Sequence, residues 1–200
     1  PEPPAVSRLE LPPLAAYVHI PWCVRKCPYC DFNSHAAGAS LPENAYVDAL
    51  LEDLDADQEQ IQSRKLTSIF FGGGTPSLFS ASALERILEG MRQRVGFADD
   101  IEITLEANPG TFEQAKFRDY RSLGINRLSI GVQSFQADKL KALGRIHDGD
   151  EAVRAADMAR AAGFDNFNLD LMHGLPQQRL DDALGGLRTA IAQQPTPLSW

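Results

Sequence analysis

The sequence has no long apolar run and no surplus of positive charge. No stretch of the 200 residues approaches the ~18 consecutive apolar residues that a membrane-spanning helix needs. Nineteen Lys and Arg stand against 27 Asp and Glu, a formal net charge of −8, so a basic surface for nucleic acid or anionic lipid is not expected. Residues 1–13 lack the basic flank and apolar core of a secretion signal. We therefore predict a cytoplasmic protein with no nucleic-acid partner.

Cysteine is also scarce, because the chain has only three and all lie between Cys23 and Cys30. An odd, clustered set excludes the disulfide framework of a small secreted protein. It favours a reducing compartment and a metal or redox role instead. Hydrophobic residues make up 44% and charged residues 23%, which is the balance of a folded globular protein.

Segments of strand character alternate with segments of helical character along the chain. Apolar segments predict strands over 14–20, 67–71, 101–106, 126–132 and 166–172, and a sixth from 197. Helical spacing of apolar residues, together with residues that start or end helices, predicts helices over 42–62, 80–95, 111–123, 136–143, 150–162 and 180–193. The alternation predicts an α/β fold with a parallel sheet and five to six βα units.

The predicted organisation is an extended arm over 1–13 followed by one domain over 14–200. The arm contains five prolines and no periodic pattern, so no packed structure is expected there. The last predicted strand is left unfinished at Trp200. We therefore expect the natural protein to continue beyond this chain.

The cysteines follow the first predicted strand with the spacing C-x3-C-x2-C, at Cys23, Cys27 and Cys30. Three thiolates on one short loop can hold a soft metal centre. A cubane [4Fe-4S] cluster has four irons, so three cysteines leave one iron open to another ligand. A structural zinc ion needs four protein ligands, and His19 or His35 is a candidate for the fourth. A zinc-stapled α/β domain is therefore the alternative.

Polar residues and glycines stand at the ends of the predicted strands. Glycines in the run 73–76 (Gly-Gly-Thr-Pro) let backbone amides approach a ligand closely. Glu106 ends the third strand, where a carboxylate can accept from an ammonium or hydroxyl group. Gln133 follows the fourth strand and Asp170 lies in the fifth. Arg145 is a candidate partner of Asp170 or of an anionic substrate. For each of these residues a purely structural role is the alternative, either in a turn or as a polar group that is hydrogen-bonded within the protein.

The pattern C-x3-C-x2-C after the first strand of a βα chain resembles the radical S-adenosylmethionine (SAM) superfamily. That resemblance implies a partial (β/α) TIM-like barrel, with the active site at the carboxyl ends of the strands. It also implies a [4Fe-4S] cluster ligated by Cys23, Cys27 and Cys30, whose open iron binds SAM.

A longer series of motifs narrows the resemblance. Tyr-Val-His-Ile-Pro-Trp-Cys, Phe-Gly-Gly-Gly-Thr-Pro, Glu-Ala-Asn-Pro, Gly-Val-Gln-Ser-Phe and Leu-Gly-Arg occur in order between Tyr17 and Pro176. The series resembles the oxygen-independent coproporphyrinogen III oxidase family, most closely its heme chaperone (HemW) branch. The resemblance implies SAM contacts from Tyr17, Tyr29, Gly73 and Glu106. Residues that match a second SAM site of the oxidase branch are Gly74, Thr75, Gln133, Arg145 and Asp170.

The two branches differ just after the third cysteine. The oxidase branch resembles C-x3-C-x2-C-x-C, whereas Phe32 occupies the fourth cysteine position here. The oxidase branch also has a longer arm before the position of Tyr17. We therefore expect a heme chaperone that binds heme and delivers it to respiratory hemoproteins. Because the SAM-site residues are present, oxidative decarboxylation of coproporphyrinogen III to protoporphyrinogen IX is the alternative, and no catalytic residue is assigned.

The resemblance also sets expectations about partners. Heme is the expected cargo and apo-hemoproteins of the respiratory chain are the expected clients, with membrane contact only through those clients. The resemblance allows a homodimer but does not specify the oligomeric state. The heme ligand is not specified by spacing, and the candidates are His19, His35, His147 and His173. The family's His-Asn-x-x-Tyr-Trp motif is not in the 200 residues.

Overall fold

A computed structural model describes residues 10–200, apart from the side chains of residues 111–114. Its main sheet has six parallel strands in the order β1-β4-β5-β6-β7-β8. The strands are β1 (Leu14–Ile20), β4 (Leu66–Gly73), β5 (Phe97–Ala107), β6 (Arg127–Gln133), β7 (Asn166–Leu171) and β8 (Leu198–Ser199). Because the strands are parallel, all their carboxyl ends meet at one edge of the sheet.

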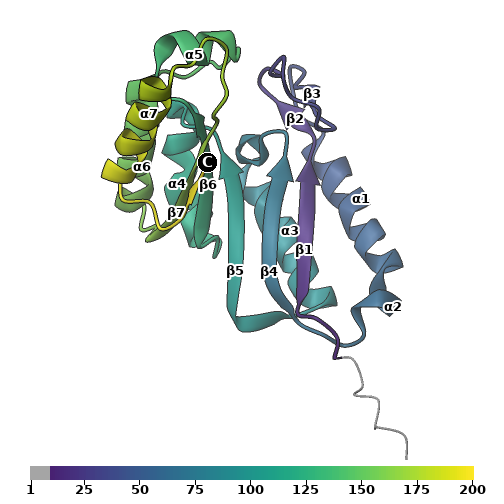
Figure 1. Cartoon of the computed structure of the whole chain (residues 1–200). Coiled ribbons are helices and arrows are strands. Elements are labelled where there is room, and N and C mark those ends of the chain that lie inside the picture. Colours follow the sequence, from purple (N-terminus) through teal and green to yellow (C-terminus); the bar gives the residue numbers. More distant parts are fainter. Residues whose placement is uncertain (1–9) are drawn as a thin grey trace, which may run out of the picture.

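The helices connect successive strands and cover one face of the curved sheet (Figure 1). They are α1 (Glu43–Ala56), α2 (Gln58–Ile61), α3 (Ala81–Arg94), α4 (Thr111–Ser122), α5 (Ala137–Ala142), α6 (Gly149–Ala161) and α7 (Leu180–Ala192). The predicted α/β fold with a partial barrel is confirmed. None of the helices in residues 10–200 is long and apolar enough to cross a membrane.

Alternation along the central strands decides which side chains face the helices. In β6, Leu128, Ile130 and Val132 are fully buried in the hydrophobic core, whereas Ser129 and Gln133 point to the opposite face. The same alternation in β5 and β7 places apolar residues against the helices and polar residues on the other face. The face of the sheet away from the helices is therefore polar toward the carboxyl ends of the strands.

Several boundaries differ from the sequence prediction. The predicted helix over 42–62 is interrupted at Asp57, which joins α1 to α2. Strand β5 begins at Phe97, four residues earlier than predicted. The cysteine loop contains two short paired strands, β2 (Trp22–Cys23) and β3 (His35–Ala36), that were not predicted. The predicted arm falls largely on residues 1–9, which lie outside the described residues. The boundary between the arm and the domain, after residue 13, stays a prediction.

Candidate functional site

A cavity of about 500 Å³ opens at the carboxyl ends of the strands, beside the cysteine loop. Nine of the twelve predicted site residues line it, although they come from segments far apart in the sequence. These are Cys23, Cys27, Tyr29, Cys30, Thr75, Glu106, Gln133, Arg145 and Asp170. The cavity thus brings together thiols, carboxylates and a guanidinium group, as expected of an active site at this edge of a partial barrel.

The three cysteines are in no disulfide and are partly buried. The backbone amide of Thr75 donates to the Trp22 carbonyl at 2.7 Å, which ties the loop to the end of β4. In residues 10–200, with the gap at the 111–114 side chains, no three potential ligands surround a single metal position. In a cubane cluster each thiolate holds a different iron, so the thiols need not converge on one ion.

Both histidines considered for zinc have other partners. His19 shares hydrogen bonds with the Tyr17 hydroxyl at 3.1 Å and with the Asn33 carbonyl at 2.8 Å. His35 Nε2 lies 3.1 Å from Asn33 Oδ1. A zinc ion on His19 would have to displace one of these two contacts, whereas His35 has one ring nitrogen engaged with Asn33.

The glycines after β4 permit a close approach of backbone to the neighbouring elements. Gly73 has φ +116°, in the left-handed region, and a Cβ there would lie 2.6 Å from the His19 ring. A Cβ on Gly74 would lie 2.6 Å from the Trp22 carbonyl oxygen. A Cβ on Gly72 would meet Tyr17, Phe70 and Glu106 within 3.2 Å. The run therefore keeps the backbone close to the loop that carries Cys23.

Glu106 is the carboxylate nearest to these glycines, and the Gly73 amide donates to its Oε2 at 3.1 Å. Burial raises the pKa of Glu106 to about 7, the Gly73 hydrogen bond opposes the rise, and the charge of Asp170 adds to it. Above pH 7 the ionised group can accept hydrogen bonds from a ligand ammonium. Below pH 7 it is mostly protonated and loses that charge.

Replacing Glu106 by glutamine is expected to stabilise the ligand-free chain at alkaline pH. A raised pKa means that the folded state binds the proton more tightly, so stability falls as pH rises from 4.5 to about 7. At pH 8, Glu106→Gln should raise the free energy of unfolding by about 1–2 kcal/mol, discounted for partial exposure. Urea unfolding at pH 8 and pH 4.5 measures this, and the gain should vanish at pH 4.5.

The exposed Asp100 on the same strand provides the matched control. Asp100→Asn should leave the pH dependence as in the unmodified chain. Destabilisation by Glu106→Gln at pH 8, or an equal gain at both pH values, contradicts the assigned pKa.

Arg145 crosses the cavity and connects three separate segments. Its Nη2 donates to Asn108 Oδ1 at 2.6 Å and to the Gly131 carbonyl at 2.7 Å, and its Nη1 lies 3.6 Å from Cys27 Sγ. Its Nε is buried and has no partner among the described residues. The terminal nitrogens of Arg145 therefore join the cysteine loop to the ends of β5 and β6.

Arg145 was one predicted partner of Asp170, and that prediction is wrong. Asp170 accepts instead from Ser129 Oγ at 2.7 Å and from Asn168 Nδ2 at 2.6 Å. These residues lie on the same face of the sheet, which brings their polar groups within reach. Both carboxylate oxygens of Asp170 therefore already have a neutral donor, and Arg145 is left for a ligand.

Gln133 and Tyr29 complete the wall of the cavity. Gln133 has φ +64° at the end of β6, an unusual conformation for a residue with a side chain. Strained residues of this kind concentrate at functional sites. Burial raises the pKa of the Tyr29 hydroxyl, the nearby Arg145 lowers it, and Cys27 raises it.

Three predicted residues do not line the cavity itself. The Tyr17 ring is 60% exposed and stacks on Phe70, which does line the cavity, with 6.2 Å between ring centroids. Gly73 and Gly74 lie behind the wall, and their amides donate to Glu106 and to the Ile20 carbonyl. These residues support the cavity, and their predicted contacts with SAM stay predictions.

Sequence analysis missed eight residues that line the cavity, namely Phe70, Ala107, Asn108, Arg127, Ser129, Gly131, Asn168 and Ser199. Asn108 links Arg145 to Thr75, whose hydroxyl accepts from Asn108 Nδ2 at 3.2 Å. The missed signal was alternation, because Phe70 and Asn168 share a strand face with residues that point into the cavity. Asn108 stands in the Glu-Ala-Asn-Pro motif, two residues after Glu106.

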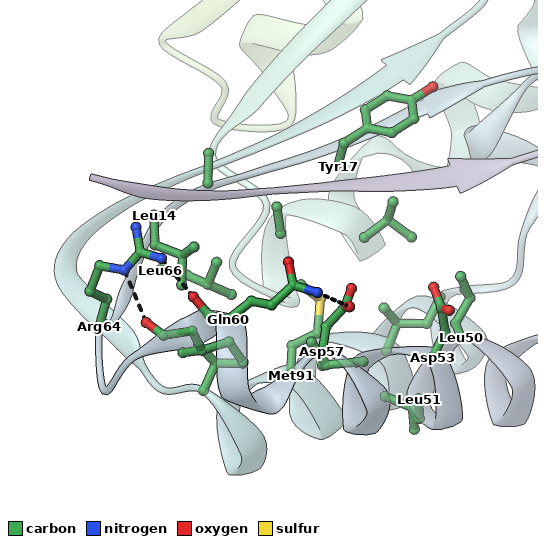
Figure 2. A pocket seen from close by; sticks show the side chains of 17 residues that line it. Leu14, Tyr17, Leu50, Leu51, Asp53, Asp57, Gln60, Arg64, Leu66 and Met91 are labelled. Atoms are coloured by element: carbon green, nitrogen blue, oxygen red, sulfur yellow. Dashed lines mark hydrogen bonds between the residues drawn. The ribbon is translucent and has the colours of Figure 1, made fainter. Parts of the chain in front are cut away.

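A second cavity, of about 370 Å³, lies between β1 and the helices α1, α2 and α3 (Figure 2). Its wall includes five leucines and also polar residues, and the Tyr17 side chain lies on the other side of β1 from the labelled α1 residues (Figure 2). The Arg64 guanidinium there donates to the carbonyls of Pro12, Gln60 and Ile61. Because its cation is satisfied and no cysteine lines it, this cavity is not the candidate site.

Residues 17–185 match the radical SAM superfamily. The chain is 58% identical over 192 residues to the heme chaperone HemW of Escherichia coli (strain K12), covering 96% of this chain and 51% of that protein. It is 36% identical to the heme chaperone HemW of Bacillus subtilis (strain 168), and the match covers 89% of this chain and 47% of that protein. The chain thus spans about half the length of the curated relatives it matches.

A solved structure of coproporphyrinogen III oxidase (HemN) from Escherichia coli, titled a radical SAM enzyme, has a TM-score of 0.83 at 29% identity. The match covers 94% of this chain and 44% of the HemN chain. HydG, a maturase of the [FeFe]-hydrogenase, has a TM-score of 0.61 at 17% identity, which shows a shared fold alone. It covers 92% of this chain and 41% of that one.

Proposed function

The chain belongs to the radical SAM superfamily, and from this premise we propose that it acts as a heme chaperone that binds heme and delivers it to apo-hemoproteins of the respiratory chain. Relatives named as heme chaperones, at 58% and 56% identity over 96% of this chain, support the proposal. The observation that carries it is Phe32, 59% exposed at the cavity, where the oxidase branch has a fourth cysteine. Three cysteines in no disulfide suit the cytoplasm, which is part of the proposal.

Family membership implies a [4Fe-4S] cluster and SAM, and the residues present fit both groups. Cys23, Cys27 and Cys30 would hold the cluster, since they are in no disulfide and lie together at the cavity. Glu106 would hold the amino group of SAM, with Tyr17, Tyr29 and Gly73 nearby, while the amides of Gly73, Gly74 and Thr75 donate within the chain. When bound, the cluster and SAM supply one-electron chemistry. The residues that match the second SAM site are Gly74, Thr75, Gln133, Arg145 and Asp170.

The chain's own residues would fix the ligand and exclude water. Ionised Glu106 would accept from an ammonium group, and Arg145 Nε would donate to an anionic group from its buried position. Phe32 has no proton to give or take, whereas a cysteine at that place could relay one to a substrate. The proposed site can therefore hold its cofactors without a group to complete a decarboxylation.

The alternative function is coproporphyrinogen III dehydrogenase, favoured by the fold shared with the oxidase. The test uses protein with its cluster reconstituted anaerobically, given SAM, a reductant and coproporphyrinogen III. We expect no protoporphyrinogen IX by mass spectrometry, and transfer of bound heme to an apo-hemoprotein in a parallel assay. Protoporphyrinogen IX formed in excess over protein would overturn the chaperone proposal. A colourless protein that binds zinc would overturn the proposal that the cysteines hold a cluster.

A further inference from the structure

Ser34 is a buried polar residue in the cysteine loop. It is 1% exposed, although its neighbours Asn33 and His35 are exposed. Its hydroxyl oxygen lies 3.9 Å from Cys30 Sγ, and this hydroxyl has no other partner among the described residues. Because burial removes water as a partner for the hydroxyl, the Cys30 sulfur is the group left for it to bind.

Binding of a metal by Cys30 decides the direction of this hydrogen bond. While the thiol carries its proton, either atom can be the donor. A cysteine that ligates iron is deprotonated and can only accept, so the Ser34 hydroxyl is then the donor. Arg145 Nη1 lies 3.6 Å from Cys27 Sγ, whereas Cys23 Sγ has no hydrogen-bond donor in the described part of the chain. The three predicted ligand sulfurs therefore have different surroundings.

Contacts on both sides fix the position of Ser34. Its amide donates to the Phe32 carbonyl at 2.7 Å, and the amide of His35 donates to the Pro21 carbonyl, also at 2.7 Å. The Lys26 ammonium group donates to the carbonyls of Phe32 at 3.2 Å and of Ser34 at 3.1 Å. Lys26 thus ties the part of the loop before the second cysteine to the part after the third, and it holds Ser34 beside the sulfur.

A hydroxyl donor at a ligand sulfur affects the reduction potential of an iron–sulfur cluster. Reduction adds negative charge, part of which lies on the sulfur ligands, so a donor stabilises the reduced state more than the oxidised state. Hydrogen bonds to the sulfurs are among the factors that set these potentials. Because Ser34 is shielded from water, its hydrogen bond lies at low local dielectric, where it is stronger.

We propose that the Ser34 hydroxyl donates to the Cys30 sulfur and raises the reduction potential of the cluster, with Lys26 as the positioning residue that holds Ser34 in place. The inference rests on the proposed [4Fe-4S] site and adds a residue that is not a ligand. A cluster that is easier to reduce is a weaker reductant. That property suits a protein that carries its ligand unchanged better than one that breaks a bond in a substrate.

The test is a redox titration of the anaerobically reconstituted protein without SAM, followed by the electron paramagnetic resonance signal of the reduced cluster. At a fixed applied potential, Ser34→Ala should lower the ratio of reduced to oxidised cluster about five- to tenfold, where tenfold corresponds to about 59 mV for one electron. Ser40→Ala removes an exposed hydroxyl from the same part of the chain. As the matched control, it should leave the ratio within about twofold.

Lys26→Met tests the positioning role, and Arg25→Met is its control for the loss of one positive charge from the same loop. Lys26→Met should lower the ratio further than Arg25→Met does, because only Lys26 donates to the Ser34 carbonyl. The double variant of Ser34→Ala and Lys26→Met should show less than the sum of the two single effects, since both act through one hydrogen bond.

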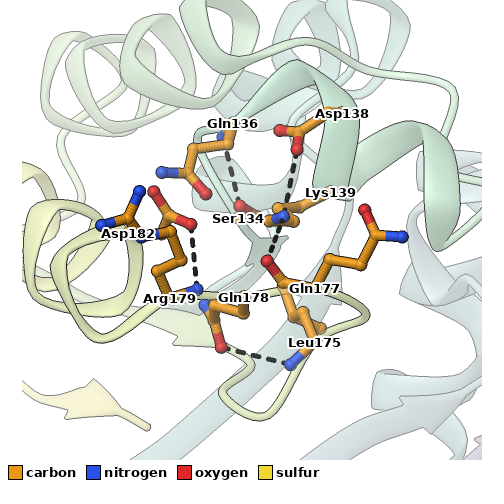
Figure 3. Close-up of polar contacts among 9 residues, drawn as sticks. All are labelled: Ser134, Gln136, Asp138, Lys139, Leu175, Gln177, Gln178, Arg179 and Asp182. Atoms are coloured by element: carbon orange, nitrogen blue, oxygen red, sulfur yellow. Dashed lines mark hydrogen bonds and ion pairs between the residues drawn. The ribbon is translucent and has the colours of Figure 1, made fainter.

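A second lysine anchors a loop that contains no cysteine, between β7 and α7 (Figure 3). Lys139 of α5, 5% exposed, donates from Nζ to the Gln177 carbonyl at 3.1 Å and pairs with Asp138 at 3.0 Å. Lys139→Met removes a positive charge and frees a loop carbonyl, as Lys26→Met does. It should leave the ratio within about twofold, because it does not affect a donor to a cluster sulfur.

An unchanged ratio in Ser34→Ala with full iron content would overturn the inference, while the cluster and the chaperone function stand. An equal fall in Ser40→Ala or Lys139→Met would also overturn it, since the effect would not be specific to the Cys30 sulfur. If Ser34→Ala loses its iron, equal ratios in Lys26→Met and Arg25→Met overturn the inference instead. Failure of the unmodified protein to hold a cluster would overturn both the inference and the proposed cluster.

Discussion

Replacing Cys27 by alanine is expected to abolish the iron–sulfur cluster, with iron falling from about four atoms per chain to near zero. The sequence contains only three cysteines, so no other thiol can replace the lost ligand. Cys27 is also the sulfur that lies 3.6 Å from Arg145 Nη1, in the wall of the cavity. Iron and sulfide analysis after anaerobic reconstitution, with the absorption spectrum, measures the loss.

Phe32→Cys is the matched variant, because it alters the same loop and leaves the three predicted ligands in place. It should retain the cluster at the level of the unmodified protein. Retention of about four irons by Cys27→Ala would show that Cys27 is not a ligand. Loss of iron from Phe32→Cys would mean that the loop, rather than the thiol, is the sensitive element.

A second large effect is expected from Gly74→Ala, which should lower the free energy of unfolding by about 3 kcal/mol. The added Cβ would lie within 2.9 Å of three backbone atoms of Trp22, and backbone cannot move aside as a flexible side chain can. Relief of the clash requires a shift of the segment that holds Cys23. Cluster content should therefore fall together with the stability, as measured by urea unfolding and iron analysis.

Gly185 offers the contrasting substitution. It lies inside α7 with nothing within 4 Å of an added Cβ. Gly185→Ala should raise the free energy of unfolding by about 0.5–1 kcal/mol, because alanine favours a helix over glycine. An equal change in the free energy of unfolding for Gly74→Ala and Gly185→Ala would contradict the close packing of Gly74 against Trp22.

Much of the fold follows from local patterns in the sequence. The strand over 14–20 is confirmed at both ends, and Ser80 accepts from the Ala83 amide at the start of α3, near the predicted start of that helix. The first residues of β5 were missed because Asp99 and Asp100 are exposed and read as a loop. The break at Asp57 was missed because the apolar spacing continues across it, from Leu54 to Ile61.

The cysteine spacing, the strand-end residues and, for Tyr29, the family resemblance predicted nine of the side chains that line the cavity. The pairing of these side chains is a property of the fold. Arg145 bonds to Asn108 and Gly131 on two neighbouring strand ends, which no local pattern reveals. Asp170 takes one partner, Ser129, from the adjacent strand β6 and the other, Asn168, from its own strand β7, both on the same face. The φ of +64° at Gln133 likewise depends on how β6 ends against β7, where the Gln133 carbonyl accepts from the Met172 amide.

The contact between Arg145 and Cys27 has a consequence for how the protein is made. The two residues are 118 positions apart. At about 5–20 residues per second, a ribosome needs roughly 6–24 s to reach the arginine after it has added the cysteine. During that interval the thiols are on a nascent chain without the guanidinium that completes their surroundings. The surroundings of Cys27 are therefore complete only after Arg145 has been added to the chain.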